Sequence, residues 1–121
     1  MSTLNVLIVD DEVDLVNELV EVMQSVGIRS TGEYSGEGAL EAAKKEEFDV
    51  VVTDMMMPGM DGLELIQAIE KLGRPNIRYI VISGHLDMGG DPLAVGDGIA
   101  CTVFAKPVNT VALIRAIENV A

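Results

Sequence analysis

The chain has 121 residues, 49% of them hydrophobic, which is enough for one domain whose core needs no disulfide or metal support. Its 20 acidic and 8 basic residues give a formal net charge of −12. A chain this acidic is repelled by nucleic acid and by anionic membranes, so no direct nucleic-acid binding is expected.

The cysteine content and the hydropathy pattern favour a cytoplasmic location. Cys101 is the single cysteine, so an internal disulfide is excluded, and its apolar neighbours in residues 99–104 predict a buried thiol. No apolar run approaches the length of a membrane span, and we expect no membrane insertion.

Strand-like and helical segments alternate along the chain. Short runs rich in Val, Ile and Leu predict strands at residues 5–9, 28–31, 50–53, 78–82 and 101–105. Apolar residues at three- and four-residue spacing predict helices that begin after Asp11, Ser35, Gly62 and Asn109, and Ser35 and Asn109 are typical helix N-caps. This alternation predicts an α/β fold with a parallel sheet, right-handed crossovers and a single domain over residues 1–121, with no output domain.

The stretch 84–98 departs from this pattern. It holds Pro92 and five of the 12 glycines (84, 89, 90, 96 and 98), and both residue types disfavour a helix interior. We therefore expect a shortened or irregular fourth helix, with a short helical piece around residues 92–95.

Polar side chains follow four of the five predicted strands. Asp10 and Asp11 follow the first strand, Asp54 the third, Ser83 the fourth and Lys106 the fifth. The carboxyl ends of parallel strands share one edge of the sheet, where open α/β proteins bind their ligands. We therefore expect these five side chains to lie close together.

Three carboxylates at one edge repel one another unless a cation joins them. Oxygen ligands without His or Cys favour Mg²⁺, which keeps several waters and leaves room for a phosphate oxygen. Lys106 would supply a second positive charge to a transferring phosphoryl group, and Ser83 a hydrogen bond. Asp54, between the metal and the lysine, is then expected to be the nucleophile that forms an acyl phosphate.

Each of these residues also has a simpler interpretation. Asp10 and Asp11 could cap the helix that follows them, and Asp61 with Gly62 is a common turn pair, which is the interpretation we prefer for Asp61. Ser83 could end its strand in a turn, and Lys106 could be a solvated lysine. Their combination at one sheet edge favours the phosphoryl-transfer site.

The sequence resembles the receiver domains of bacterial two-component response regulators over essentially its whole length. The resemblance is carried by Val-Asp-Asp-Glu at 9–12, Asp-Met-Met-Met-Pro-Gly-Met-Asp-Gly at 54–62, Ser-Gly at 83–84 and Lys-Pro at 106–107. It implies a doubly wound, flavodoxin-like (CheY-like) sheet of five parallel strands in the order 2-1-3-4-5.

The resemblance implies roles for the site residues. Asp54 would accept a phosphoryl group from the phosphohistidine of a histidine kinase or a histidine phosphotransfer protein. Asp11, Asp54 and the Met56 backbone carbonyl would bind Mg²⁺ directly, and Asp10 would act through water. Lys106 would pair with the phosphoryl group, Ser83 would move to hydrogen-bond it, and Pro107 would follow a cis peptide bond.

The resemblance also implies how the signal leaves the site. Phe104 matches an aromatic switch that turns inward when Ser83 moves, although an aromatic residue on a strand is usually a packing residue. The fourth helix, fifth strand and last helix would form the face that controls a downstream protein target. Met56 and His85 would face the phosphoryl group; apolar Met56 should not orient water, and solvation is the simpler role for His85. Such a domain is a switch and not an enzyme, apart from slow autodephosphorylation.

Three alternatives stay open. The chain can be a solitary receiver or a part of a larger regulator or hybrid kinase. A flavodoxin-like cofactor carrier would need a hydroxyl- and glycine-rich phosphate loop where this chain has Asp10, Asp11 and Glu12, whose charges repel the phosphate of FMN. An Asp-nucleophile phosphatase would need a second acid two residues after the nucleophile, where Met56 stands.

Overall fold

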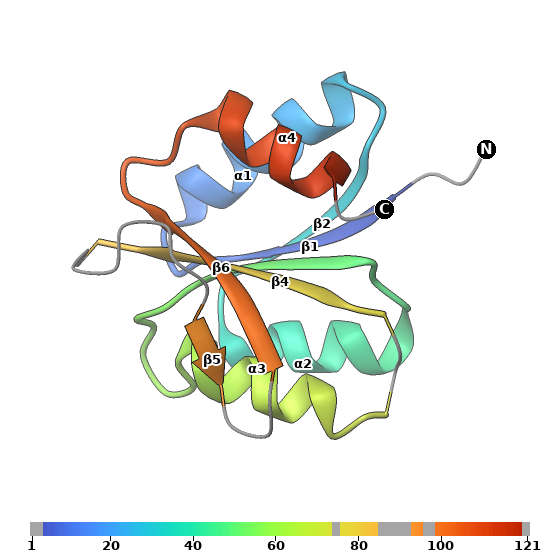
Figure 1. Cartoon of the computed structure of the whole chain (residues 1–121), viewed down its shortest axis with the longest axis vertical. Helices are drawn as coiled ribbons and strands as arrows, with labels where there is room; N and C mark the ends of the chain where they lie inside the picture. The colour runs from blue at the N-terminus through green and yellow to red at the C-terminus, as the bar shows by residue number, and fades with distance from the viewer. Residues whose placement is uncertain (1–3, 74–75, 85–92, 96–98, 120–121) are drawn as a thin grey trace.

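A computed structural model describes residues 4–73, 76–84, 93–95 and 99–119, with the backbone alone at 93–95 and 99–101. Helices and strands alternate over most of this length (Figure 1). In chain order they are β1 (Asn5–Val9), α1 (Val13–Ser25), β2 (Arg29–Glu33), α2 (Gly36–Lys45), β3 (Val50–Asp54), α3 (Gly62–Glu70), β4 (Arg78–Ser83), β5 (Leu93–Val95), β6 (Ile99–Ala105) and α4 (Thr110–Asn119).

All of the described strands belong to one sheet, in the order β2-β1-β3-β4-β6-β5. The first five in this order pair in parallel, and β5 pairs antiparallel with β6 at the edge. Counted along the chain without β5, the parallel strands have the order 2-1-3-4-5. The predicted α/β architecture and strand order are therefore confirmed.

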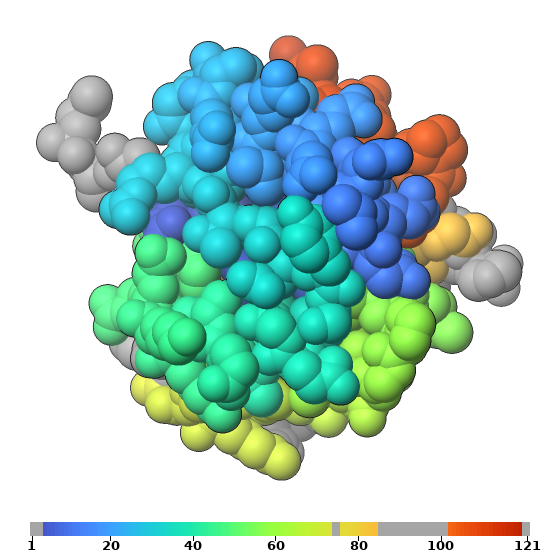
Figure 2. Space-filling view, turned by 180° about the vertical axis from the view of Figure 1, so that it is seen from behind, coloured from blue at the N-terminus to red at the C-terminus, as the bar shows by residue number. Residues whose placement is uncertain are grey.

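The side chains of each central strand alternate between two cores, one on each face of the sheet. In β1, Leu7 and Val9 pack with residues of α2 and α3, whereas Val6 and Ile8 pack with residues of α1 and α4. Figure 1 shows the two helix pairs on opposite sides of the sheet, and the view from behind in Figure 2 shows α1 in blue above α2 in teal. Because both faces are covered, the strands are almost continuously apolar.

Side chains at the helix starts fix where the helices begin. Ser35 Oγ accepts a hydrogen bond from Gly38 N at 3.0 Å, and Asn109 Oδ1 accepts one from Ala112 N at 3.1 Å, so both predicted caps are confirmed. Asp61 forms a capping box with Glu64 at the start of α3. The interpretation of Asp61 as only a turn residue is therefore wrong.

The segment between β4 and β6 corrects a second expectation. Leu93–Val95 is a strand, so the short helical piece expected around residues 92–95 is wrong for these three residues. The free edge of β6 offers backbone hydrogen-bond partners to a three-residue segment. A helix of the same length would form too few hydrogen bonds to offset the entropy cost of its nucleation. The broader expectation of a shortened or irregular fourth helix is consistent with this strand.

Other predictions differ only in detail or fall outside the described residues. β2 starts at Arg29 and β6 at Ile99, one or two residues from the predicted limits. His85 and the side chain of Cys101 lie outside what the structure describes. Within the described ranges, no helix combines the length and the apolar character that a membrane crossing requires.

Candidate functional site

The carboxyl edge of the sheet brings together the five polar residues that follow the strands in sequence. Asp10 and Asp11 follow β1, Asp54 ends β3, Ser83 ends β4 and Lys106 follows β6. These strand ends are level because the strands pair in parallel and in close register. The juxtaposition expected from the sequence pattern is present in the structure.

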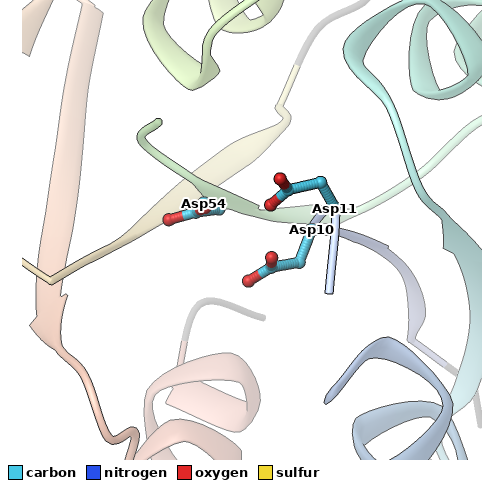
Figure 3. Close-up of side chains that lie close together, drawn as sticks. All are labelled: Asp10, Asp11 and Asp54. Carbon is cyan, nitrogen blue, oxygen red and sulfur yellow. The ribbon is translucent and has the colours of Figure 1, made fainter. Parts of the chain in front are cut away.

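The three aspartates form a compact acidic cluster (Figure 3). Each offers one carboxylate oxygen, and these oxygens lie within 4.8 Å of one another. Asp10 is 2% exposed and Asp54 is 5% exposed, whereas Asp11 is exposed. A buried and an exposed carboxylate therefore converge on Asp54 from the neighbouring strand end.

The Lys106 ammonium supplies the positive charge of this cluster. Its Nζ lies 3.2 Å from Asp10 Oδ2, 3.3 Å from Glu12 Oε1 and 3.5 Å from Asp54 Oδ1. The lysine side chain is 24% exposed, so its contacts with the buried Asp10 and Asp54 are shielded from much of the solvent. One ammonium group thus lies within ion-pair distance of three carboxylates.

The crowding changes the ionisation of the buried groups. Burial raises the pKa of Asp54, and the charge of Asp11 adds to this, although Lys106 and the Met56 backbone N–H act in the opposite direction. Burial and the charge of Asp54 likewise raise the pKa of Asp10 above its usual range, against the Glu12 N–H and Lys106. For Lys106, partial burial lowers the pKa, but the contacts with Asp10, Asp54 and Glu12 outweigh it and raise the pKa. The site therefore favours additional positive charge.

One buried carboxylate oxygen of the cluster lacks a hydrogen bond. Asp10 Oδ1 accepts a hydrogen bond from Glu12 N at 2.9 Å. Asp10 Oδ2 is also buried but accepts no hydrogen bond within the described part of the chain, and its close cationic neighbour is Lys106. A cluster of carboxylate oxygens with an unsatisfied acceptor fits a hard divalent cation such as Mg²⁺.

The loop from β3 to α3 folds back tightly over the end of β3. Gly62 N donates to Met55 O at 2.9 Å, and the Thr53 hydroxyl donates to Asp54 O at 3.0 Å. The Met56 N–H faces the Asp54 carboxylate, while Met56 as a whole residue is 65% exposed. The backbone of this loop therefore fixes Asp54 and turns the Met56 side chain outward.

Ser83 ends the strand beside that of Asp54, and Phe104 lies one strand further on, in β6. Ser83 is buried, and its carbonyl accepts a hydrogen bond from Lys106 N at 2.9 Å. Phe104 is half-buried and packs against the core on the α1 and α4 side of the sheet. The Lys106–Pro107 peptide bond is cis, as the resemblance implied.

Glu12 belongs to the site, although the sequence pattern assigned it no role of its own. It is the N-cap residue of α1, but its side chain makes no capping hydrogen bond and instead accepts one from Lys106 Nζ. The signal in the sequence is the third acid of the Asp10-Asp11-Glu12 run. Its contact with Lys106 joins residues 94 positions apart, which a local pattern does not reveal.

A cavity of about 480 Å³ opens beside the cluster, between α1 and the loop that follows β6. Leu15 and Val108 give it apolar surface, and Glu12, Glu18 and Lys106 give it charge. Lys106 lines the cavity and also contacts Asp10 and Asp54, so the cavity adjoins the site.

Comparisons with known proteins agree with this geometry. The family model described as the response regulator receiver domain matches residues 6–118. Sporulation initiation phosphotransferase F of Bacillus subtilis is 37% identical over 109 residues, which cover 88% of this chain and 85% of that protein. Response regulator receiver protein Anae109_2439 of Anaeromyxobacter is 34% identical over 84% of this chain but only 42% of its own length.

A solved structure supports the fold. The chemotaxis protein CheY4 of Vibrio cholerae superposes with a TM-score of 0.85 at 24% identity, covering 99% of this chain and 100% of that one. At this identity the likeness shows the fold alone, and the family rests on the sequence matches. The chain belongs to the response regulator receiver domain family.

Proposed function

We propose that this chain is a phosphorylation-dependent signalling switch of the cytoplasm, in which Asp54 accepts a phosphoryl group in the presence of Mg²⁺. The donor would be the phosphohistidine of a histidine kinase or a histidine phosphotransfer protein. The observation that carries this proposal is that the Asp54 side chain, which is 7% exposed, lies beside Asp10 and Asp11 and 3.5 Å from Lys106 Nζ.

Each residue of the site has a separate proposed role in the transfer of the phosphoryl group. Asp11, Asp54 and the Met56 carbonyl would hold Mg²⁺, with Asp10 acting through water, and the bound ion would neutralise charge on the phosphoryl oxygens. An Asp54 oxygen attacks phosphorus while the bond between phosphorus and the histidine nitrogen breaks. Lys106 keeps Asp54 ionised before the transfer and donates to a phosphoryl oxygen after it.

We propose that Ser83 and Phe104 transmit the effect of phosphorylation from the site to the surface of the domain. Ser83 ends the strand next to Asp54, so a small movement would bring its hydroxyl to the phosphoryl group. Phe104 follows on the adjacent strand and is only half-buried, which leaves it room to turn inward. The face of β6 and α4 would then present the changed surface to a downstream protein target.

The relatives suggest two settings for such a switch. The Bacillus subtilis relative is named as a phosphotransferase, and this chain could likewise pass its phosphoryl group to a further protein. The Anaeromyxobacter relative is more than twice as long as the matched region, which fits a receiver within a larger regulator.

Labelling by acetyl phosphate tests the proposal. We expect Mg²⁺-dependent phosphorylation of the wild-type protein and none of Asp54→Asn. Asp14→Asn is the matched control, because Asp14 is an exposed aspartate in the first turn of α1. Equal labelling of wild type and Asp54→Asn, or labelling of neither, would contradict the proposal.

A further inference from the structure

We propose that Glu12 is the resting partner of Lys106 and that a phosphoryl oxygen on Asp54 takes its place on the ammonium. This inference rests on the proposed function and gives Glu12 a positioning role in it. Glu12 would thereby set how readily the site accepts and keeps a phosphoryl group.

The backbone and side chain of Glu12 serve different purposes. Its backbone is extended, with φ −80° and ψ 100°, as is usual for the N-cap of a helix. A Glu side chain is a poor cap, and here it makes no capping hydrogen bond. Glu12 Oε1 instead accepts a hydrogen bond from Lys106 Nζ at 3.3 Å, and both residues line the cavity.

The Lys106 ammonium is already shared by three carboxylates. It carries three N–H groups and lies within ion-pair distance of three carboxylates, those of Asp10, Glu12 and Asp54. A phosphoryl oxygen that binds Lys106 therefore competes with these three carboxylates for the same cation. Which carboxylate leaves depends on what else can hold each of them.

Glu12 is the carboxylate that can leave at least cost. Asp10 and Asp54 are buried and share the acidic cluster with Asp11, where a cation would hold them in place. Glu12 lies outside that cluster, and its side chain is 66% exposed, so it returns to water without desolvation. The phosphoryl group therefore competes mainly with Glu12.

The size of the effect follows from the exposure of the pair. Ion pairs with one well-solvated partner shift an equilibrium by roughly two- to fivefold. Removing the Glu12 carboxylate should therefore speed the phosphorylation of Asp54 by acetyl phosphate by about two- to fivefold. Loss of a mere surface charge would act on an anionic donor in the same direction, so the experiment must separate contact from charge.

Three variants make that separation. Glu12→Gln removes the charge and therefore the ion pair with Lys106, whereas Glu12→Asp keeps the charge but shortens the side chain by one methylene. Glu18→Gln removes a charge that lines the same cavity on α1, and Glu18 is not among the three carboxylates at Lys106. The initial rate of labelling with acetyl phosphate and Mg²⁺ is measured for each variant.

The expected result is faster labelling of Glu12→Gln and Glu12→Asp, with Glu18→Gln close to wild type. Acceleration by Glu18→Gln as large as that by Glu12→Gln would overturn the inference. So would wild-type behaviour of Glu12→Asp, or a rate for Glu12→Gln that is unchanged or lower.

A second readout does not depend on phosphorylation. The ¹⁵N NMR signal of the Lys106 ammonium is recorded in the metal-free protein, with Lys106→Arg used to assign it. We expect the signal to shift in both Glu12 variants and to stay in Glu18→Gln, whereas an unshifted signal in Glu12→Gln would overturn the contact itself. If no protein is labelled, the proposed function fails, and the NMR result still decides the Glu12–Lys106 contact.

Discussion

Gly62 lies so close to the backbone of Asp54 that a Cβ at Gly62 would stand 2.4 Å from the Asp54 carbonyl oxygen and 3.1 Å from Met55 Cα. Both neighbouring atoms belong to backbone, so neither can move aside by changing a rotamer. The start of α3 is therefore packed directly onto the residue that we propose as the phosphoacceptor.

Gly62→Ala should destabilise the protein by about 1–3 kcal/mol, because the β3–α3 loop must shift to admit the methyl group. The matched control is Gly84→Ala, since no atom of the described residues lies within 4 Å of a Cβ at Gly84, and its cost should stay within about 0.5 kcal/mol. Urea unfolding of both variants measures the difference. Equal stability of the two variants would contradict the close packing at Gly62.

The acidic cluster predicts graded effects on Mg²⁺ affinity. Asp10→Asn should weaken Mg²⁺ binding by about 10- to 100-fold, in line with the water-mediated role that we propose for it, and Asp11→Asn should weaken it further. Asp14→Asn, on the first turn of α1, should leave the affinity unchanged. Isothermal titration calorimetry measures all three, and wild-type affinity in Asp11→Asn would remove Asp11 from the site.

The raised pKa of Asp54 predicts a pH-dependent stability difference. Because burial raises this pKa, the folded protein holds the Asp54 proton more tightly than the unfolded chain does. The contribution of Asp54 to the free energy of unfolding therefore falls as the pH rises from 3.8, the ordinary pKa, through the higher pKa of the folded protein. Above the folded pKa this loss is complete. In metal-free protein, Asp54→Asn should be more stable than wild type at pH 7.

The comparison at low pH provides the control for that prediction. Below pH 3.8 the Asp54 carboxyl is protonated in both states, so the stability difference between wild type and Asp54→Asn should largely vanish. Thermal unfolding at both pH values measures this. A wild-type protein more stable than Asp54→Asn at pH 7 without metal would contradict the cost of ionising Asp54.

Ser83→Ala tests whether Ser83 and Phe104 transmit the effect of phosphorylation. A hydrogen bond to a charged group contributes about 1.5–3 kcal/mol, so the variant should bind beryllofluoride, a phosphoryl mimic, roughly 10- to 100-fold more weakly. The NMR signals of the Phe104 ring should change on binding in wild type and much less in Ser83→Ala. Thr102→Ala, an exposed position on β6, is the control, and a full Phe104 response in Ser83→Ala would exclude this role of Ser83.

The polar residues at the sheet edge could be predicted from the sequence because they follow apolar runs that are typical of buried strands. Asp54 and Ser83 end apolar runs of nearly equal length, and parallel strands bring such ends level. The role of Glu12 could not be predicted, because a side chain that leaves its own helix to meet Lys106 depends on tertiary distance. The pairing of Leu93–Val95 was missed for a related reason: a three-residue strand exists only by virtue of the edge of β6.

The central claim is that Asp54 forms the acyl phosphate, and chemical trapping of the acyl phosphate tests this claim most directly. An acyl phosphate on aspartate is reduced by borohydride to homoserine, which marks the residue that carried the phosphoryl group. After treatment with acetyl phosphate, Mg²⁺ and borohydride, peptide mass spectrometry should find homoserine at position 54. Homoserine at Asp10 or Asp11, or at no position while the protein is phosphorylated, would contradict Asp54 as the phosphoacceptor.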